Sequence, residues 1–228
     1  LNATHYKIYG AKGIEKWAEK AAGKDFIFCP KMYKGVTHFG GLSNKKFLSD
    51  EFLRGVVAFK EQLGPIFIQV SDSFTPKRKD ELFTYLKSLP TDLQFFLEVR
   101  HQDWFGNETI REELFSFLKD NNIGIVITDT AGKRGCAHMY LTIPKTFIRY
   151  VGNSLHATDF TRIDEWVKRI KYWLDKGMNE LYFFMHMHDE ATSPELTVYL
   201  VDKMNKECKL ALIKPKFVEA LPNQSVLF

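Results

Sequence analysis

The chain reads Gln94-Phe95-Phe96-Leu97-Glu98-Val99-Arg100-His101-Gln102-Asp103-Trp104-Phe105 where an apolar run ends in a group of ionisable side chains. Residues 95–99 are mostly apolar, which predicts a strand covered on both faces, as in a parallel sheet. Because side chains alternate along a strand, Glu98 and Arg100 point to the same face, and we expect them to pair. Charged residues at the C-terminal end of a parallel strand are typical of active sites in α/β folds, although a purely structural ion pair predicts the same pattern.

The composition favours one domain of an intracellular protein. A chain of 228 residues with 45% hydrophobic content can bury one sizeable core, and a single α/β barrel fits this length. The formal net charge of +4 is smaller than that of dedicated nucleic-acid binders. The three cysteines show no CxxC spacing, which predicts reduced thiols and a cytoplasmic protein. No apolar run is long enough to cross a membrane, and no signal peptide is visible.

Short apolar strands alternate with amphipathic helices along the chain, which indicates a parallel sheet with helical crossovers. Strands are expected at residues 1–9, 26–29, 66–70, 95–100, 125–129, 147–151 and 181–187. Helices are expected at residues 14–22, 51–63, 80–88, 112–121 and 163–176.

The expected strands are one short of the eight in a TIM barrel. We therefore predict an α/β fold of the TIM-type (β/α) barrel class, lacking its first β/α unit in this sequence, with residues 1–228 as one domain and 213–228 as a surface tail. An open doubly wound sheet is the alternative. No GxGxxG or GxxxxGK[ST] motif follows a strand, so the usual nucleotide signatures of such sheets are absent.

Several motifs, in order along nearly the whole chain, resemble those of the YecE-like family, a group of domains of unknown function with a TIM-barrel fold. They are Asn2-Ala3-Thr4-His5-Tyr6, Lys31 with Thr37-His38, residues 63–69, residues 98–105 and Phe147-Ile148-Arg149. The resemblance implies the barrel fold and an absent first β/α unit, but no reaction. Family members carry a histidine where this chain has Val151, and paired asparagines where it has Met185 and His186. These departures imply that part of the pocket has been rebuilt.

The candidate site residues each lie where an expected strand ends. Because the C-terminal ends of barrel strands meet on one rim, we expect these side chains to share a pocket. Lys31, Arg100 and Arg149 favour a small anionic ligand that carries a phosphate or a carboxylate, since a guanidinium grips either group with paired hydrogen bonds. Gln69 and Trp104 are expected to border the same ligand.

Two carboxylates at strand ends are the candidates for catalysis. Glu98 and Asp129 can act as a general acid or base, so a hydrolase or a lyase is one interpretation. The alternative is that these charges pair among themselves and only fill the barrel mouth. A nucleic-acid-binding or metal-dependent nuclease-like barrel is a further alternative, because a basic rim can also contact phosphodiesters.

A metal site is the alternative to a site without cofactors. His186 and His188 are two residues apart, so they share a face if the strand continues through both, and Asp189 or Glu190 can add a ligand for a divalent metal. The HxH pattern alone is weak, and a third ligand of fixed geometry is not evident. We therefore expect no cofactor, and we expect a small anionic molecule as the partner.

Overall fold

The computed structural model describes residues 1–130 and 135–217, which are divided between two compact units. Unit 1 comprises Leu1–Ile148 and Glu180–Tyr182, and unit 2 comprises Arg149–Asn179 and Phe183–Phe228. Among the described residues, no helix is both long enough and apolar enough to cross a membrane.

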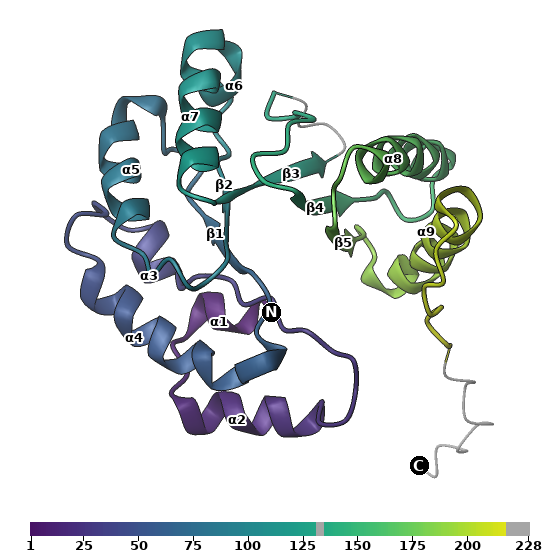
Figure 1. The fold of residues 1–228 in the computed structure, drawn as a ribbon, viewed down its shortest axis with the longest axis horizontal. Helices are drawn as coiled ribbons and strands as arrows, with labels where there is room; N and C mark the ends of the chain where they lie inside the picture. Colours follow the sequence, from purple (N-terminus) through teal and green to yellow (C-terminus); the bar gives the residue numbers. More distant parts are fainter. Residues whose placement is uncertain (131–134, 218–228) are drawn as a thin grey trace, which may run out of the picture. The chain divides into compact units, whose positions relative to one another are not determined.

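The chain has an α/β fold whose five parallel strands form a half-barrel. The strands are neighbours in chain order, as Figure 1 shows. They are β1 (Ile66–Gln69), β2 (Phe95–Glu98), β3 (Gly124–Thr130), β4 (Lys145–Val151) and β5 (Glu180–His186). The expected strands in these five regions are confirmed, with ends that shift by a few residues.

The register of β1, β2 and β3 separates two faces of the sheet. Ile68 pairs with Leu97, and Leu97 pairs with Ile125, so these apolar side chains share the face that packs in the core of unit 1. Phe67 pairs with Phe96 on the opposite face. There, aromatic rings meet at centroid distances of 5.2 Å for Phe67 with Phe147, 5.5 Å for Phe96 with Phe147 and 6.4 Å for Phe96 with Tyr182.

The expected strand at residues 1–9 is wrong, because α1 (Ala3–Tyr6) forms there. Asn2 precedes this single turn, and the Thr4 hydroxyl donates to the Leu1 carbonyl oxygen at 2.8 Å. Such local bonds from a side chain to the backbone compete with strand pairing. The same hydroxyl lies 2.9 Å from the Lys31 carbonyl oxygen, which fastens α1 to the segment at residues 26–32.

The expected strand at residues 26–29 is extended but does not form a continuous strand. It runs parallel to β1 only through isolated pairs, Phe28 with Leu63 and Lys31 with Phe67. Pro30 and Pro65 lie between these pairs and carry no N–H to donate, so the ladder is interrupted. The segment still holds Lys31 beside the C-terminal end of β1.

Helices cover the core face of unit 1 and connect its strands. The expected helix at residues 51–63 divides into α4 and a 3-10 helix, η1, and Lys60 within η1 adopts a positive φ of 53°. The longer elements of unit 1 are α2 (Ala11–Lys20), α4 (Lys46–Val56), η1 (Val57–Gln62), α5 (Lys79–Lys87) and α7 (Glu108–Asp120). The short turns are α3 (Lys34–Thr37), η2 (Pro76–Arg78) and α6 (Asp103–Gly106).

Unit 2 is built on α8 (Ala157–Asp175) and α9 (Ser193–Cys208), with η3 (Glu190–Thr192) between β5 and α9. The sequence analysis did not expect α9. The buried Asp159 carboxylate accepts from the Asn153 backbone N–H at 2.8 Å and lies 3.4 Å from Arg162, so this acid fastens the connection between β4 and α8.

Candidate functional site

A chain of hydrogen bonds crosses the C-terminal ends of β1 and β2. The Lys31 ammonium Nζ donates to Gln69 Oε1 at 2.9 Å, and Gln69 Nε2 donates to Glu98 Oε2 at 2.8 Å. The sheet register pairs Gln69 with Glu98, so both side chains leave neighbouring strands on the same face. Gln69 is 4% exposed and Glu98 is 1% exposed. The amide therefore connects a cation to a carboxylate that is removed from water, and it satisfies part of that carboxylate's demand for hydrogen bonds.

Arg100 extends the network, but its nearest carboxylate is not the expected one. Its Nε lies 2.9 Å from Asp72 Oδ1 and 3.8 Å from Glu98 Oε1. The predicted pairing with Glu98 is thus present only at the longer distance. Asp72 follows the end of β1, and the sequence analysis missed it because the loop at residues 71–75 shows no pattern of its own. The Arg100 side chain is 34% exposed, so the guanidinium faces solvent at the edge of the network.

Two histidines complete the site, and the sequence analysis did not place them in it. His5 on α1 has Nδ1 2.7 Å from the Met32 carbonyl oxygen, and its ring centroid lies 5.0 Å from that of His38. His38 follows α3 and has Nδ1 2.7 Å from Thr37 Oγ1. Both histidines occur in the motifs that resemble the YecE-like family. That placement is the signal in the sequence that marks them.

Both imidazoles are neutral at pH 7. Burial lowers the pKa of His5 to about 4, and the positive charge of Lys31 lowers it further against the raising effect of the Met32 carbonyl. Burial also lowers the pKa of His38, with further lowering by Lys31 and Arg100. Burial is the largest cause of both lowered pKa values, and the nearby cations add to an environment that already disfavours a charged imidazole.

We refer to these residues together as the strand-end cluster. It consists of His5, Lys31, His38, Gln69, Asp72, Glu98 and Arg100.

The structure places Trp104 in the core of unit 1 and Asp129 near the end of β3. Trp104 is fully buried in the core, and its indole N–H donates to the Phe74 carbonyl oxygen at 2.8 Å. Because Leu97 pairs with Ile125, continued alternation along β3 places Asp129 on the core face, opposite to Glu98. Contact of either residue with a ligand remains a prediction.

The remaining predicted residues belong to unit 2. Arg149 lies on β4, and its contact with a ligand remains a prediction. His186 is the last residue of β5, so the strand does not continue to His188. His186 Nδ1 lies 3.2 Å from Glu190 Oε1. Across residues 1–130 and 135–217, no group of three or more His, Cys, Asp or Glu side chains is placed to hold a metal ion.

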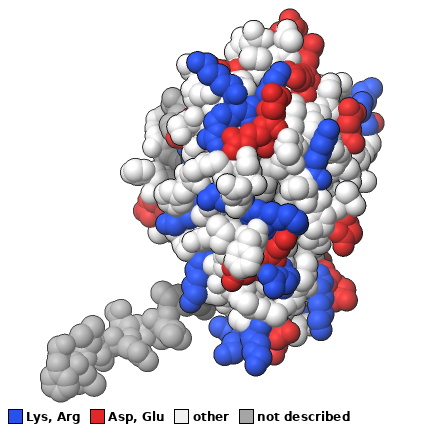
Figure 2. Space-filling model, turned by 90° about the vertical axis from the view of Figure 1, so that its left-hand side faces the viewer, with Lys and Arg blue, Asp and Glu red and all other residues white. Residues whose placement is uncertain are grey.

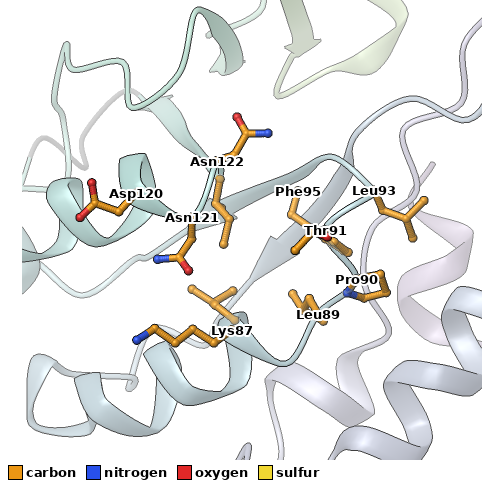
Figure 3. A pocket seen from close by; sticks show the side chains of 11 residues that line it. Lys87, Leu89, Pro90, Thr91, Leu93, Phe95, Asp120, Asn121 and Asn122 are labelled. Carbon is orange, nitrogen blue, oxygen red and sulfur yellow. The ribbon is translucent and has the colours of Figure 1, made fainter.

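A cavity of about 270 Å³ lies at the other end of the sheet in unit 1, before β2 and β3 begin. Figure 3 shows Lys87, Asp120 and Asn121 on one side of it and Leu89, Pro90 and Leu93 on the other. We call it the strand-start cavity. None of the residues that the sequence analysis predicted for the site lines it.

Basic and acidic side chains are interspersed on the surface seen from the side where α4 and α5 lie in Figure 1. Figure 2 shows blue and red groups next to one another on this face, rather than one long basic groove. Nucleic-acid binding needs many phosphate contacts along such a groove, so this face does not favour it.

Comparisons with known proteins agree with the predicted resemblance. The family described as "Protein of unknown function DUF72" matches residues 1–221. The UPF0759 protein YecE of Escherichia coli (strain K12) is 25% identical over 245 residues, which cover 100% of this chain and 88% of that protein.

Solved structures match as well. A DUF72 family protein from Enterococcus faecalis V583 superposes with a TM-score of 0.70 at 18% identity, over 96% of this chain and 87% of that one. A DUF72 family protein from Thermotoga maritima MSB8 gives a TM-score of 0.63 at 20% identity, over 91% and 82%. These structures share the fold.

Proposed function

The chain belongs to the DUF72 family, and we propose that it binds a small phosphate- or carboxylate-bearing anion at the strand-end cluster. The observation that carries the proposal is the buried chain of hydrogen bonds from Lys31 through Gln69 to Glu98. It holds an ammonium group at the end of β1, where the Arg100 guanidinium also faces solvent.

The charges around this chain favour an anion. Lys31, Arg100 and Lys34 are cations that lower the pKa of the His38 ring, while the Asp72 carboxylate raises it. We infer that Arg100 and Lys31 attract a ligand with negative charge and offer charge-assisted hydrogen bonds to its oxygens.

The burial of Glu98 also supports a ligand site over a purely structural role. A buried ionic network is rarely the most stable filling of a core, because well-packed apolar residues avoid the desolvation of the charges. Buried charge at the C-terminal ends of parallel strands is typical of functional sites in TIM-type barrels. We retain that architecture in the proposal, with the segment at residues 26–32 in the position of a further strand beside β1.

Chemistry at the site extends the same proposal. Glu98 is the acid–base group that we assign to a hydrolase or lyase reaction, since its hydrogen bond to Gln69 orients it on the ligand face of β2. Asp129 is the alternative carboxylate, and Arg149 is the further cation that we expect to contact the anion.

The test is calorimetric titration of the protein with inorganic phosphate, sulfate and acetate. We expect Lys31→Met to weaken binding by about tenfold or more, because it removes a charge-assisted hydrogen bond worth about 1.5–3 kcal/mol. The matched control is Lys87→Met, which removes an exposed lysine at the strand-start cavity and leaves binding unchanged. Equal loss in both variants contradicts the proposal, and an unchanged affinity in Arg149→Met removes Arg149 from it.

A further inference from the structure

We propose that His38 takes up a proton when an anion binds to the strand-end cluster, so that anion binding strengthens as the pH falls. The inference rests on the proposed function and adds its regulation by protons. It assigns His38 as a ligand-contacting group that changes its charge with the site's occupancy.

The first step is the set of charges that face His38. Lys31 comes from the extended segment beside β1, Arg100 from the end of β2 and Lys34 from α3, and all three are cations. Asp72, after β1, is an anion that raises the pKa of this ring, and the His5 ring on α1 lies edge-on to it at a centroid distance of 5.0 Å. Protonated His38 would therefore add a further cation beside these three, in a cluster whose carboxylates are Asp72 and the buried Glu98.

The second step is what an anion changes. In the free protein, partial burial and, after it, repulsion by Lys31 and Arg100 lower the pKa of the imidazole below its ordinary value and keep the ring neutral. A bound dianion screens those cations and attracts the imidazolium. Because binding and protonation are linked, an anion that raises the proton affinity of His38 is itself bound more tightly when His38 is protonated.

The third step is the hydrogen bond between His38 Nδ1 and Thr37 Oγ1, at 2.7 Å. A hydroxyl can donate or accept, so Thr37 donates to an unprotonated Nδ1 and accepts from a protonated one. The proton comes from solvent, and rotation of the hydroxyl preserves this bond. Protonation of His38 therefore loses no hydrogen bond, and Nε2–H becomes a charged donor to the anion.

His5 offers the contrast within the same cluster. Its Nδ1 contacts the Met32 carbonyl oxygen, which can only accept, so Nδ1 carries the proton and Nε2 is the unprotonated nitrogen. His5 is also buried, whereas His38 is partly exposed. Protonation of His5 at Nε2 would also keep its bond to Met32, so the contrast rests on burial: His38 is the more exposed imidazole and takes up a proton from solvent at the smaller desolvation cost.

The experiment is calorimetric titration with sulfate between pH 5.5 and 8, in buffer pairs that differ in their enthalpy of ionisation. Sulfate stays fully ionised over this range, so proton uptake belongs to the protein. For the wild type we expect an affinity that rises by up to about tenfold per pH unit as the pH falls, with uptake approaching one proton per sulfate. We expect His38→Gln to bind sulfate without pH dependence, and His5→Asn to retain the wild-type dependence.

The outcomes separate this inference from the function on which it rests. Sulfate binding that involves Lys31 but takes up no proton, or a pH dependence that persists in His38→Gln, overturns the role of His38 and leaves the anion site standing. No sulfate binding at any pH contradicts the anion site itself, and with it the proton uptake. An NMR titration of the His38 ring with and without sulfate tests the same role independently of calorimetry. We expect the pKa of His38 to rise when sulfate is present.

Discussion

The two ends of the sheet in unit 1 differ in what they bury. The strand-end cluster buries a carboxylate and an amide that are hydrogen-bonded to each other, and a histidine bonded to the backbone, whereas the strand-start cavity is a hollow of about 270 Å³ with polar side chains at its margin. The cavity offers an open volume, whereas the cluster holds the charged and hydrogen-bonding groups. The comparison teaches that buried, partnered charge locates a candidate site better than volume does.

Two hydrogen bonds beside the cavity have a local structural role. Asn121 Nδ2 donates to the Phe117 carbonyl oxygen at 2.7 Å and thereby caps the end of α7. Gln94 Nε2 donates to the Asn122 carbonyl oxygen at 3.1 Å and holds the turn before β3. These bonds satisfy helix and turn ends, which need partners in any fold. No comparable local role accounts for Gln69 and Glu98.

The largest expected difference between the two ends concerns stability. We expect Glu98→Ala to lower the free energy of unfolding by about 2–4 kcal/mol, because the buried Gln69 amide loses its acceptor and the truncated side chain leaves a cavity. Asp120→Ala at the exposed margin of the cavity should change it by about 0.5 kcal/mol or less. Urea unfolding of both variants measures the difference, and equal effects would remove the distinction between the two ends.

Acid should destabilise the cluster end through His5. The pKa of His5 is about 4 in the folded protein and has its ordinary value of 6.5 when unfolded, so the unfolded state binds a proton first as the pH falls. The stability that the fold gains from a neutral His5 is fully present above pH 6.5 and is lost as the pH falls from 6.5 to 4. His5→Asn, which keeps a donor for the Met32 carbonyl, should reduce this loss by about 2–3 kcal/mol.

Thermal or urea unfolding between pH 7 and pH 4 provides the measurement. Burial also lowers the pKa of His138 to about 4, so some acid sensitivity persists in the His5 variant. The strand-start cavity has no histidine in its lining, and Lys87→Met should therefore keep the full wild-type dependence. An unchanged pH profile in His5→Asn would show that His5 is not held neutral by the fold.

The smallest expected effect comes from Asp72. Its pair with Arg100 is partly exposed, so Asp72→Asn should change the free energy of unfolding by about 1 kcal/mol or less. The same substitution removes negative charge from the cluster, and we expect sulfate affinity to rise by about two- to fivefold, the equivalent of under about 1 kcal/mol. Asp120→Asn at the cavity should leave sulfate affinity unchanged. A lower affinity in Asp72→Asn would mean that Asp72 chiefly positions Arg100.

The sequence carried enough to predict the sheet and the polar ends of β1 and β2. Period-two alternation placed Glu98 on one face, and the apolar run before it predicted burial, which the structure confirms. The strand predicted at residues 1–9 was wrong because a single helical turn is too short to leave a periodic pattern in the sequence. The extended segment before Lys31 was expected as a strand, but two prolines prevent a regular ladder.

The composition of the cluster was harder to predict. His5 and His38 come from short turns that tertiary packing brings together, and no local spacing links them. Asp72, not Glu98, is the nearer carboxylate to Arg100. The position of Asp72 depends on the loop after β1, which strand alternation does not describe. Sequence patterns therefore predicted the groups that strands carry, and missed those that loops and turns deliver.

The central claim is that the ligand site is at the strand-end cluster and not at the strand-start cavity. Tungstate, a heavy analogue of sulfate and phosphate, can be soaked into crystals of the protein and located by its anomalous scattering. The account predicts tungstate within hydrogen-bonding distance of Lys31 Nζ and the His38 ring, and its absence there in crystals of Lys31→Met. Tungstate beside Lys87 and Asn121, with none at the cluster, would contradict it.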